Sequence, residues 1–237
     1  LSAGYFVILK DRLYTFEANG KARRAAQTVL YDMLKGFVIA VSPILSFTSE
    51  EIWQSLPENF KDAKEKSVFD AKWPEQTELI PEMKLVDKNS ELADANIILK
   101  REVFFREWET IFSAKKAVSK ALEGLRQAKT IGSSLEGEVV LYTESDFLKK
   151  ALQKHAADLR YYFLVSKVEL KDGAAPAEAQ AAEDANLKLK IVAHKSAGHK
   201  CARCWNYYDK LGPEIEDLCH RCGPVVQKMP ATQGPVS

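Results

Sequence analysis

The sequence predicts a mainly α-helical protein: a helical bundle, then a small α/β segment, then a four-cysteine zinc-ribbon-like tail. Three observations predict this fold class. Apolar residues recur at three-and-four spacing in 22–41 and 90–128, as on the buried face of a helix. "GEVVLYT" and "FLVSKVEL" read as strands on either side of the amphipathic "DFLKKALQKH". All four cysteines fall between positions 201 and 222. We therefore expect the bundle with a connector in 1–88, a long helix with an α/β junction in 89–170, a linker in 171–186 and the zinc-binding module in 187–237.

The first predicted element is a helix in the opening stretch "YFVIL", placed in the same bundle as helix 22–41. Pro43 interrupts the pattern, and the next helix is expected to begin at "FTSEEIW". There Thr48 matches an N-cap, with Glu51 completing a capping box and Phe47 and Ile52 forming a hydrophobic staple. Pro57 ends this helix, and 58–88 read as an irregular connector.

The second half of the chain alternates strand and helix patterns. The long helical pattern of 90–128 ends at "IGSS", and the strand–helix–strand segment follows it. The alanine-rich "KDGAAPAEAQAAED" reads as a solvated linker. Its looseness leaves the placement of the tail open. "LKLKIVAHK" is then expected as a strand that leads into the cysteines.

The cysteines form two C-x-x-C pairs separated by fourteen residues, and this spacing predicts a metal site. Two such turns supply four thiolates to one tetrahedral zinc ion, and four thiolates leave no open position, so the zinc is expected to be structural. A thioredoxin-like redox pair and two disulfides are the alternatives; His199 or His220 could also replace a thiolate. The predicted ligands are Cys201, Cys204, Cys219 and Cys222.

Aromatic and basic residues surround the cysteines. Trp205 follows a cysteine directly, and Arg203 and Arg221 each precede the second cysteine of a pair, with Lys200 just outside. Such residues on a rigid loop suit stacking on unpaired bases and pairing with phosphates. For Trp205 the alternative, capping a small core, stays open.

Composition is ordinary for a soluble globular protein, with 46% hydrophobic and 28% charged residues and a net charge of +1. Residues 187–237 hold eight Lys or Arg against four Asp or Glu, a local basic excess. No apolar run reaches the roughly 20 residues that span a bilayer, and the opening residues lack the pattern of a signal peptide. We therefore expect a cytoplasmic protein without membrane contact. Its start at Leu1 suggests a fragment of a longer chain.

Three stretches resemble one family. "KDRLYTFEANGKARRAAQTVLYDML" with "SPILSFTSEEIWQSLP" is similar to the anticodon-binding helical domain of class I aminoacyl-tRNA synthetases, above all bacterial isoleucyl-tRNA synthetases. "ALEGLRQAKTIGSSLEGEVVLY" resembles the segment that follows in that family, and "KCARCW…LCHRCG" its C-terminal zinc module. The resemblance covers nearly the whole chain in the family's order.

The resemblance implies the C-terminal part of an isoleucine–tRNA ligase, which activates isoleucine with ATP and transfers it to tRNA(Ile). This part would bind the anticodon stem and loop with a structural zinc, while the catalytic and editing domains lie elsewhere; no catalytic residue is expected here. Tyr14 is a further candidate for stacking. The candidate RNA-binding residues are Lys10, Arg12, Arg23, Arg24, Gln27, Lys200, Arg203, Trp205 and Arg221.

Two other functions remain open at this point. One DNA-repair glycosylase family ends in a similar four-cysteine finger, but such an enzyme needs a catalytic N-terminal proline or comparable nucleophile, and this chain begins "LSAGYF". A zinc-dependent protein-interaction module is the other, and it would show no affinity for RNA.

Overall fold

The computed structural model describes residues 2–57, 65–73 and 95–229. The fold class is confirmed, since the chain is mainly helical with a small sheet and a four-cysteine cluster. Its contacts define two compact units, one made of 1–17 with 102–237 and the other of 18–101, and each is treated by itself. Within the described ranges, no helix is both long and apolar enough to cross a membrane.

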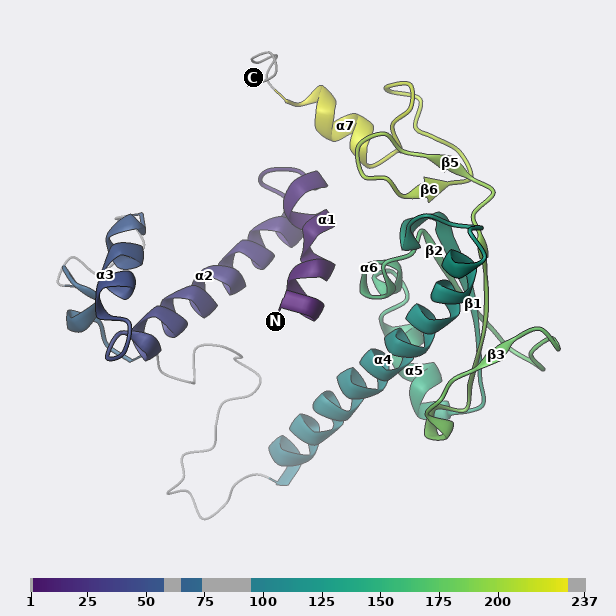
Figure 1. The fold of residues 1–237 in the computed structure, drawn as a ribbon, viewed down its shortest axis with the longest axis horizontal. Helices are drawn as coiled ribbons and strands as arrows, with labels where there is room; N and C mark the ends of the chain where they lie inside the picture. The colour runs from purple at the N-terminus through teal and green to yellow at the C-terminus, as the bar shows by residue number, and fades with distance from the viewer. Residues whose placement is uncertain (1, 58–64, 74–94, 230–237) are drawn as a thin grey trace. The chain divides into compact units, whose positions relative to one another are not determined.

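The unit of 18–101 is built around two helices (Figure 1). Helix α2, Lys21–Val41, and helix α3, Ser46–Ser55, enclose a small core with a 3-10 turn, Val68–Asp70. Trp53 is fully buried there, and its indole Nε1 donates to the carbonyl of Glu65 at 3.2 Å. The expected helix 22–41 is confirmed, although its apolar face is buried only in part, because Phe37 stays exposed. The connector predicted in 58–88 is described only at 65–73.

The capping prediction at Thr48 is wrong. Helix α3 begins three residues earlier than a cap at Thr48 implies, with Leu45 in the N-cap position and no side-chain hydrogen bond to the first turn. The helical bonding already starts there, because the Ser49 amide donates to the Leu45 carbonyl at 2.8 Å. The staple is absent too: Phe47 is 94% exposed. The amides two and three residues after Thr48, which its side chain would cap, already belong to the helical hydrogen-bond ladder, so the capping box has nothing to cap.

The larger unit contains a four-stranded sheet covered by helices on one face (Figure 1). The strand order is β2-β1-β4-β3, with β1 and β2 parallel and the other pairs antiparallel. The parallel pair is joined through two helices, as parallel strands require. After a π-helical turn, Ser2–Phe6, the elements are α1 Val7–Thr15, α4 Ala95–Gln127, β1 Gly137–Thr143, α5 Asp146–Lys154, α6 Leu159–Phe163, β2 Lys167–Lys171, β3 Gln180–Ala181 and β4 Leu189–Lys195.

The main core lies between this sheet and helices α4, α5 and α6. It contains Ile111 and Val118 from α4, Leu141 from β1, Leu152 from α5 and Phe163 from α6, all nearly inaccessible to solvent. The periodic face predicted for the long helix is therefore confirmed at these α4 positions, whereas residues 90–94 lie outside the described residues. Helix α5 begins where expected, because Ser145 accepts a hydrogen bond from the Leu148 amide.

The alanine-rich segment, strand β4 and residues 1–17 make contacts that differ from those expected from the sequence. The alanine-rich segment is largely exposed, as expected, but it contains β3, which pairs with β4. Strand β4 pairs along all seven residues with β1, so the first strand of the predicted module 187–237 is hydrogen-bonded to the α/β sheet. Residues 1–17, expected in the first bundle, belong to the same compact unit as 102–237. The four-part division by residue number stays a prediction.

The tail that follows β4 is small and irregular. Strands β5, His199–Lys200, and β6, Tyr207–Tyr208, form a two-stranded ribbon, and helix α7, Cys222–Gln227, ends the described tail. Gly198 is required at the start of the ribbon, because a Cβ there would lie 2.6 Å from the backbone oxygen of Tyr208. We call residues 196–229 the metal module.

Candidate functional site

The four cysteines converge as predicted. All four are buried, and their Sγ atoms lie within 4.8 Å of one another. A tetrahedral ion with metal–sulfur bonds of about 2.3 Å requires sulfur–sulfur separations of about 3.8 Å. The Sγ atoms of Cys204 and Cys219 lie 3.9 Å apart. The donor set therefore fits a metal ion of zinc's size and preference for sulfur. Within the described residues, neither His199 nor His220 belongs to the cluster.

Hydrogen-bond donors surround the sulfur atoms. The Cys219 amide lies 3.3 Å from Cys201 Sγ, the Tyr208 hydroxyl 3.7 Å from Cys204 Sγ, and Arg203 Nη1 3.6 Å from Cys222 Sγ. Such donors offset the negative charge that four thiolates accumulate and orient the ligands of a metal site. Arg203 carries a full positive charge, so it contributes most to this compensation.

The thiols also differ in acidity. A hydrogen bond from Cys204 lowers the pKa of Cys219 to about 7, and the same bond raises the pKa of Cys204 to about 11. Burial raises the pKa of Cys222. Thiolates, not thiols, are the metal ligands, so metal binding must release protons from this cluster.

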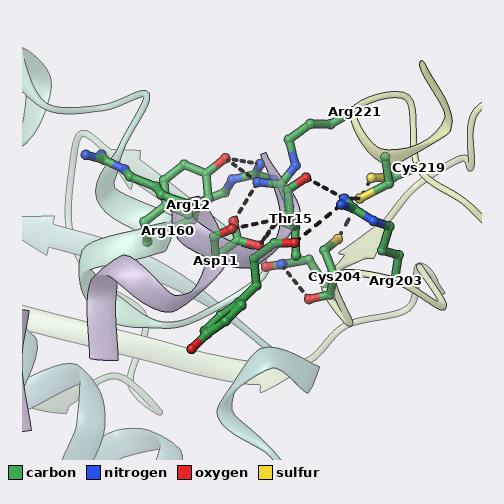
Figure 2. Close-up of polar contacts among 12 residues, drawn as sticks. Asp11, Arg12, Thr15, Arg160, Arg203, Cys204, Cys219 and Arg221 are labelled. Carbon is green, nitrogen blue, oxygen red and sulfur yellow. Dashed lines mark hydrogen bonds and ion pairs between the residues drawn. The ribbon is translucent and has the colours of Figure 1, made fainter. Parts of the chain in front are cut away.

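Arg221 connects the metal module to helix α1 (Figure 2). Its guanidinium forms a two-pronged ion pair with Asp11, with nitrogen–oxygen distances of 2.5 and 2.9 Å, and both side chains are less than a fifth exposed. It also lies over the ring of Phe16, at 4.6 Å from the ring centre, and near Tyr161. Burial acts to lower the pKa of Arg221, but the hydrogen bonds and charge of Asp11 outweigh it and raise that pKa.

Arg203 contacts the same end of α1. Its two terminal nitrogens donate to the backbone carbonyls of Thr15 and Tyr14, the latter at 3.3 Å. These carbonyls lie in the last turn of a helix, where the chain itself offers no amide partners and the helix dipole is negative. Arg203 therefore caps α1 from 188 residues away in the sequence.

Helix α6 holds the other side of α1. Arg12 forms an ion pair with Asp158 at 2.9 Å, and Phe16 packs edge-on against Tyr161 at 6.0 Å between ring centres. Arg160 donates to the Tyr161 hydroxyl at 2.6 Å and lies over the Tyr208 ring of the metal module. The last turn of α1 is thus enclosed by α6 and the metal module.

Trp205 occupies an unusual backbone position. Its φ is +63°, in the left-handed region that favours glycine. Its amide donates to the Cys201 carbonyl at 2.9 Å and so closes the first C-x-x-C turn, 201–204; we call this turn and the turn at 219–222 the two knuckles. The residue is nevertheless 61% exposed. The Lys200 ammonium lies 5.6 Å from the ring centre. A strained residue whose large side chain points mostly into solvent contributes little to the core of the module.

A cavity of about 500 Å³ lies beside Trp205. Its walls come from α1, α6, the 133–135 loop and the first knuckle, and they include Lys10, Tyr14, Arg203 and Trp205. Tyr14 is 76% exposed. The cavity therefore combines two accessible aromatic rings with basic groups.

The structure brings some of the predicted RNA-binding residues together. Lys10, Arg203 and Trp205 line this cavity, and Lys200 lies over Trp205. Arg12 and Arg221 are in the same unit but are paired with carboxylates. Arg23, Arg24 and Gln27 belong to α2 in the other unit; there Arg23 is half-buried and Arg24 exposed, as expected for consecutive helical residues. The RNA contacts of these residues stay predictions.

Sequence reasoning missed the acidic and aromatic partners of the arginines: Asp11, Asp158, Phe16 and Tyr161. The only local signal is Asp11 inside "KDR", where a carboxylate interrupts two basic residues. An acid in a presumed phosphate-binding segment is a hint that one of the cations has a partner within the protein.

Comparison with known proteins agrees with this description. Residues 1–141 match the family model described as the anticodon-binding domain of tRNA ligase. The isoleucine–tRNA ligase of Natranaerobius thermophilus is 38% identical over 96% of the chain, and that of Pseudomonas aeruginosa strain UCBPP-PA14 is 40% identical over 94%. The chain spans only about a fifth of the length of these relatives, 22% and 21% respectively.

Proposed function

Because this chain belongs to the anticodon-binding domain family of tRNA ligases, we propose that it binds the anticodon stem and loop of tRNA(Ile). The relatives over nearly its whole length carry the name isoleucine–tRNA ligase, which supports isoleucine as the amino acid of the parent enzyme. In this proposal the catalytic and editing domains lie elsewhere in the parent ligase. The enzyme activates isoleucine with ATP and transfers it to the tRNA that this chain helps to hold.

We assign zinc to the four cysteines. Four buried thiols at tetrahedral spacing suit zinc, and four thiolates leave no position for a reacting water. The ion would supply a cross-link that holds the two knuckles together. The cross-linked turn would then hold the indole of Trp205 and the ammonium of Lys200 in fixed positions at the surface.

Trp205 is the observation that carries the proposal. It keeps a large exposed ring at a backbone position where glycine is favoured, beside a mainly apolar cavity whose walls also contain Lys10 and Arg203. Aromatic rings of this kind stack on unpaired bases, and lysines pair with phosphates, which is how single-stranded loops of RNA are bound. In this proposal Trp205 and Tyr14 stack on splayed anticodon bases, while Lys10 and Lys200 contact the backbone. Arg23, Arg24 and Gln27 provide further contacts on α2.

The test is binding of the 237-residue chain to the anticodon stem-loop of tRNA(Ile) and to the same stem-loop with its anticodon replaced. Preference for the native anticodon supports recognition of isoleucine tRNA, and affinity should fall steeply with salt because phosphates dominate binding. Trp205→Ala should weaken binding by about 1–3 kcal/mol. Trp73→Ala, at an exposed tryptophan of the other unit, is the matched control. Absence of binding to either RNA would contradict the proposal.

A further inference from the structure

Each of the two knuckles directs an arginine at helix α1. Arg203 and Arg221 each precede the second cysteine of their pair, and both reach the last turns of α1. A tight C-x-x-C turn fixes the backbone on both sides of such a residue. The position of each guanidinium is therefore set by the same geometry that brings the sulfur atoms together.

Both guanidinium groups are already engaged within the protein. Arg221 has a two-pronged carboxylate partner, an aromatic face on Phe16 and only 16% of its side chain exposed. Arg203 divides its donors between two α1 carbonyls and the Cys222 sulfur. Contact with a phosphate would require breaking a buried ion pair in the first case and uncapping a helix in the second. The geometry favours attachment of the module over contact with RNA.

The attachment determines the width of the cavity. Tyr14 and Lys10 stand on α1, while Trp205 stands on the first knuckle, and all three line the cavity. Arg203, which lies two residues before Trp205 in the first knuckle, donates to the backbone carbonyl of Tyr14 itself. Any movement of α1 away from the module therefore separates the two exposed rings.

We propose that Arg203 and Arg221 are positioning residues that lock the metal module onto the last turn of α1, so that Asp11, an acid, is required for tRNA affinity. This inference rests on the proposed tRNA binding. It reverses the simple electrostatic expectation, by which removal of a negative charge from an RNA-binding surface strengthens binding.

The experiment compares Asp11→Ala, Arg221→Ala and the double variant for affinity to the stem-loop over a range of salt concentrations. We expect each single variant to weaken binding about tenfold and the double variant to be no weaker than either single one. The slope of affinity against salt should stay that of the unmodified chain. If Arg221 contacts a phosphate instead, its loss reduces the slope by about one and Asp11→Ala does not weaken binding. That result overturns the inference.

Two further variants control for charge. Asp209→Asn removes an exposed acid from the same module and should leave affinity unchanged or slightly stronger. Exchange of the pair, Asp11→Arg with Arg221→Asp, should recover part of the affinity that each single replacement loses. No recovery, together with a loss in Asp209→Asn, would show that the effects are not specific to the pair.

Hydrogen exchange provides a readout independent of RNA. In Asp11→Ala and Arg221→Ala, the amides of the last α1 turn should exchange faster while the metal content stays that of the unmodified chain. If either variant does not fold, Arg203→Lys serves instead, because lysine keeps the charge but loses the fork that spans two carbonyls. Unchanged exchange in α1 contradicts the attachment. Absence of tRNA binding by the unmodified chain contradicts the proposed function alone.

Discussion

Replacing Trp205 by glycine and by alanine separates its backbone role from its side-chain role. Both replacements remove the indole, so they differ only in how well they tolerate a φ of +63°. In the left-handed region a residue with a Cβ is less stable than glycine by about 1–2 kcal/mol, which favours the glycine variant in the folded state. The greater conformational freedom of glycine in the unfolded chain offsets about 0.4–1 kcal/mol of this difference. The glycine variant should therefore be more stable than the alanine variant by about 0.5–1 kcal/mol.

The assay is competition for zinc against a chelator, because metal binding and folding are one equilibrium in such small modules. An advantage of 0.5–1 kcal/mol corresponds to about two- to fivefold tighter zinc binding by the glycine variant. RNA affinity should behave differently: both variants should lose the same 1–3 kcal/mol, since neither carries a ring. Equal or tighter zinc binding by the alanine variant would refute the strain argument. Unchanged RNA affinity in both would refute the stacking role.

Three further predictions concern the module and the core. Metal analysis should find about one zinc per chain, and a chelator should speed proteolysis within 196–229 while the sheet stays resistant; an unchanged cleavage pattern would exclude a structural role for the ion. Gly198→Ala should destabilise the module by about 1–3 kcal/mol, measured by the same zinc competition, because its Cβ meets the Tyr208 backbone. Burial acts to raise the pKa of Glu107, but hydrogen bonds from Lys154 and His155 outweigh it and hold that pKa below its ordinary 4.5. Its contribution to stability is therefore present above pH 4.5 and is lost as the pH falls through the lowered value. Glu107→Gln should flatten the acid limb of an unfolding profile and leave its basic limb unchanged.

Local patterns predicted much of this structure. The four cysteines could be identified as one site because their spacing within each pair determines where both sulfurs point. The strand Gly137–Thr143 and the helix Asp146–Lys154 follow from alternation and amphipathic spacing, each within a single short window. For this strand and this helix, the information that fixes the element lies within the element and its immediate neighbours.

The remaining features depend on partners that no local window contains. Arg221 and Asp11 are 210 positions apart, and an ion pair has no periodic signature in the sequence. The sequence shows that Arg221 is charged but not that its charge is already matched, so a phosphate was the natural partner to predict. The prediction that Thr48 caps a helix is wrong for a related reason. The sequence pattern of a cap is present there, but the helix has already begun at Ser46, before this residue.

The alanine-rich segment has a practical consequence for protein engineering. Its first part, 172–179, joins β2 to β3, the two edge strands of one sheet, so both ends of this loop are held by the same sheet. Doubling the length of such a loop costs only about 0.6 kcal/mol. A fluorophore or an affinity tag inserted near Gly173, where an added Cβ would meet nothing within 4 Å, should therefore leave the path of β4 into the metal module unchanged. This exposed segment is therefore suited to carry a reporter of tRNA binding.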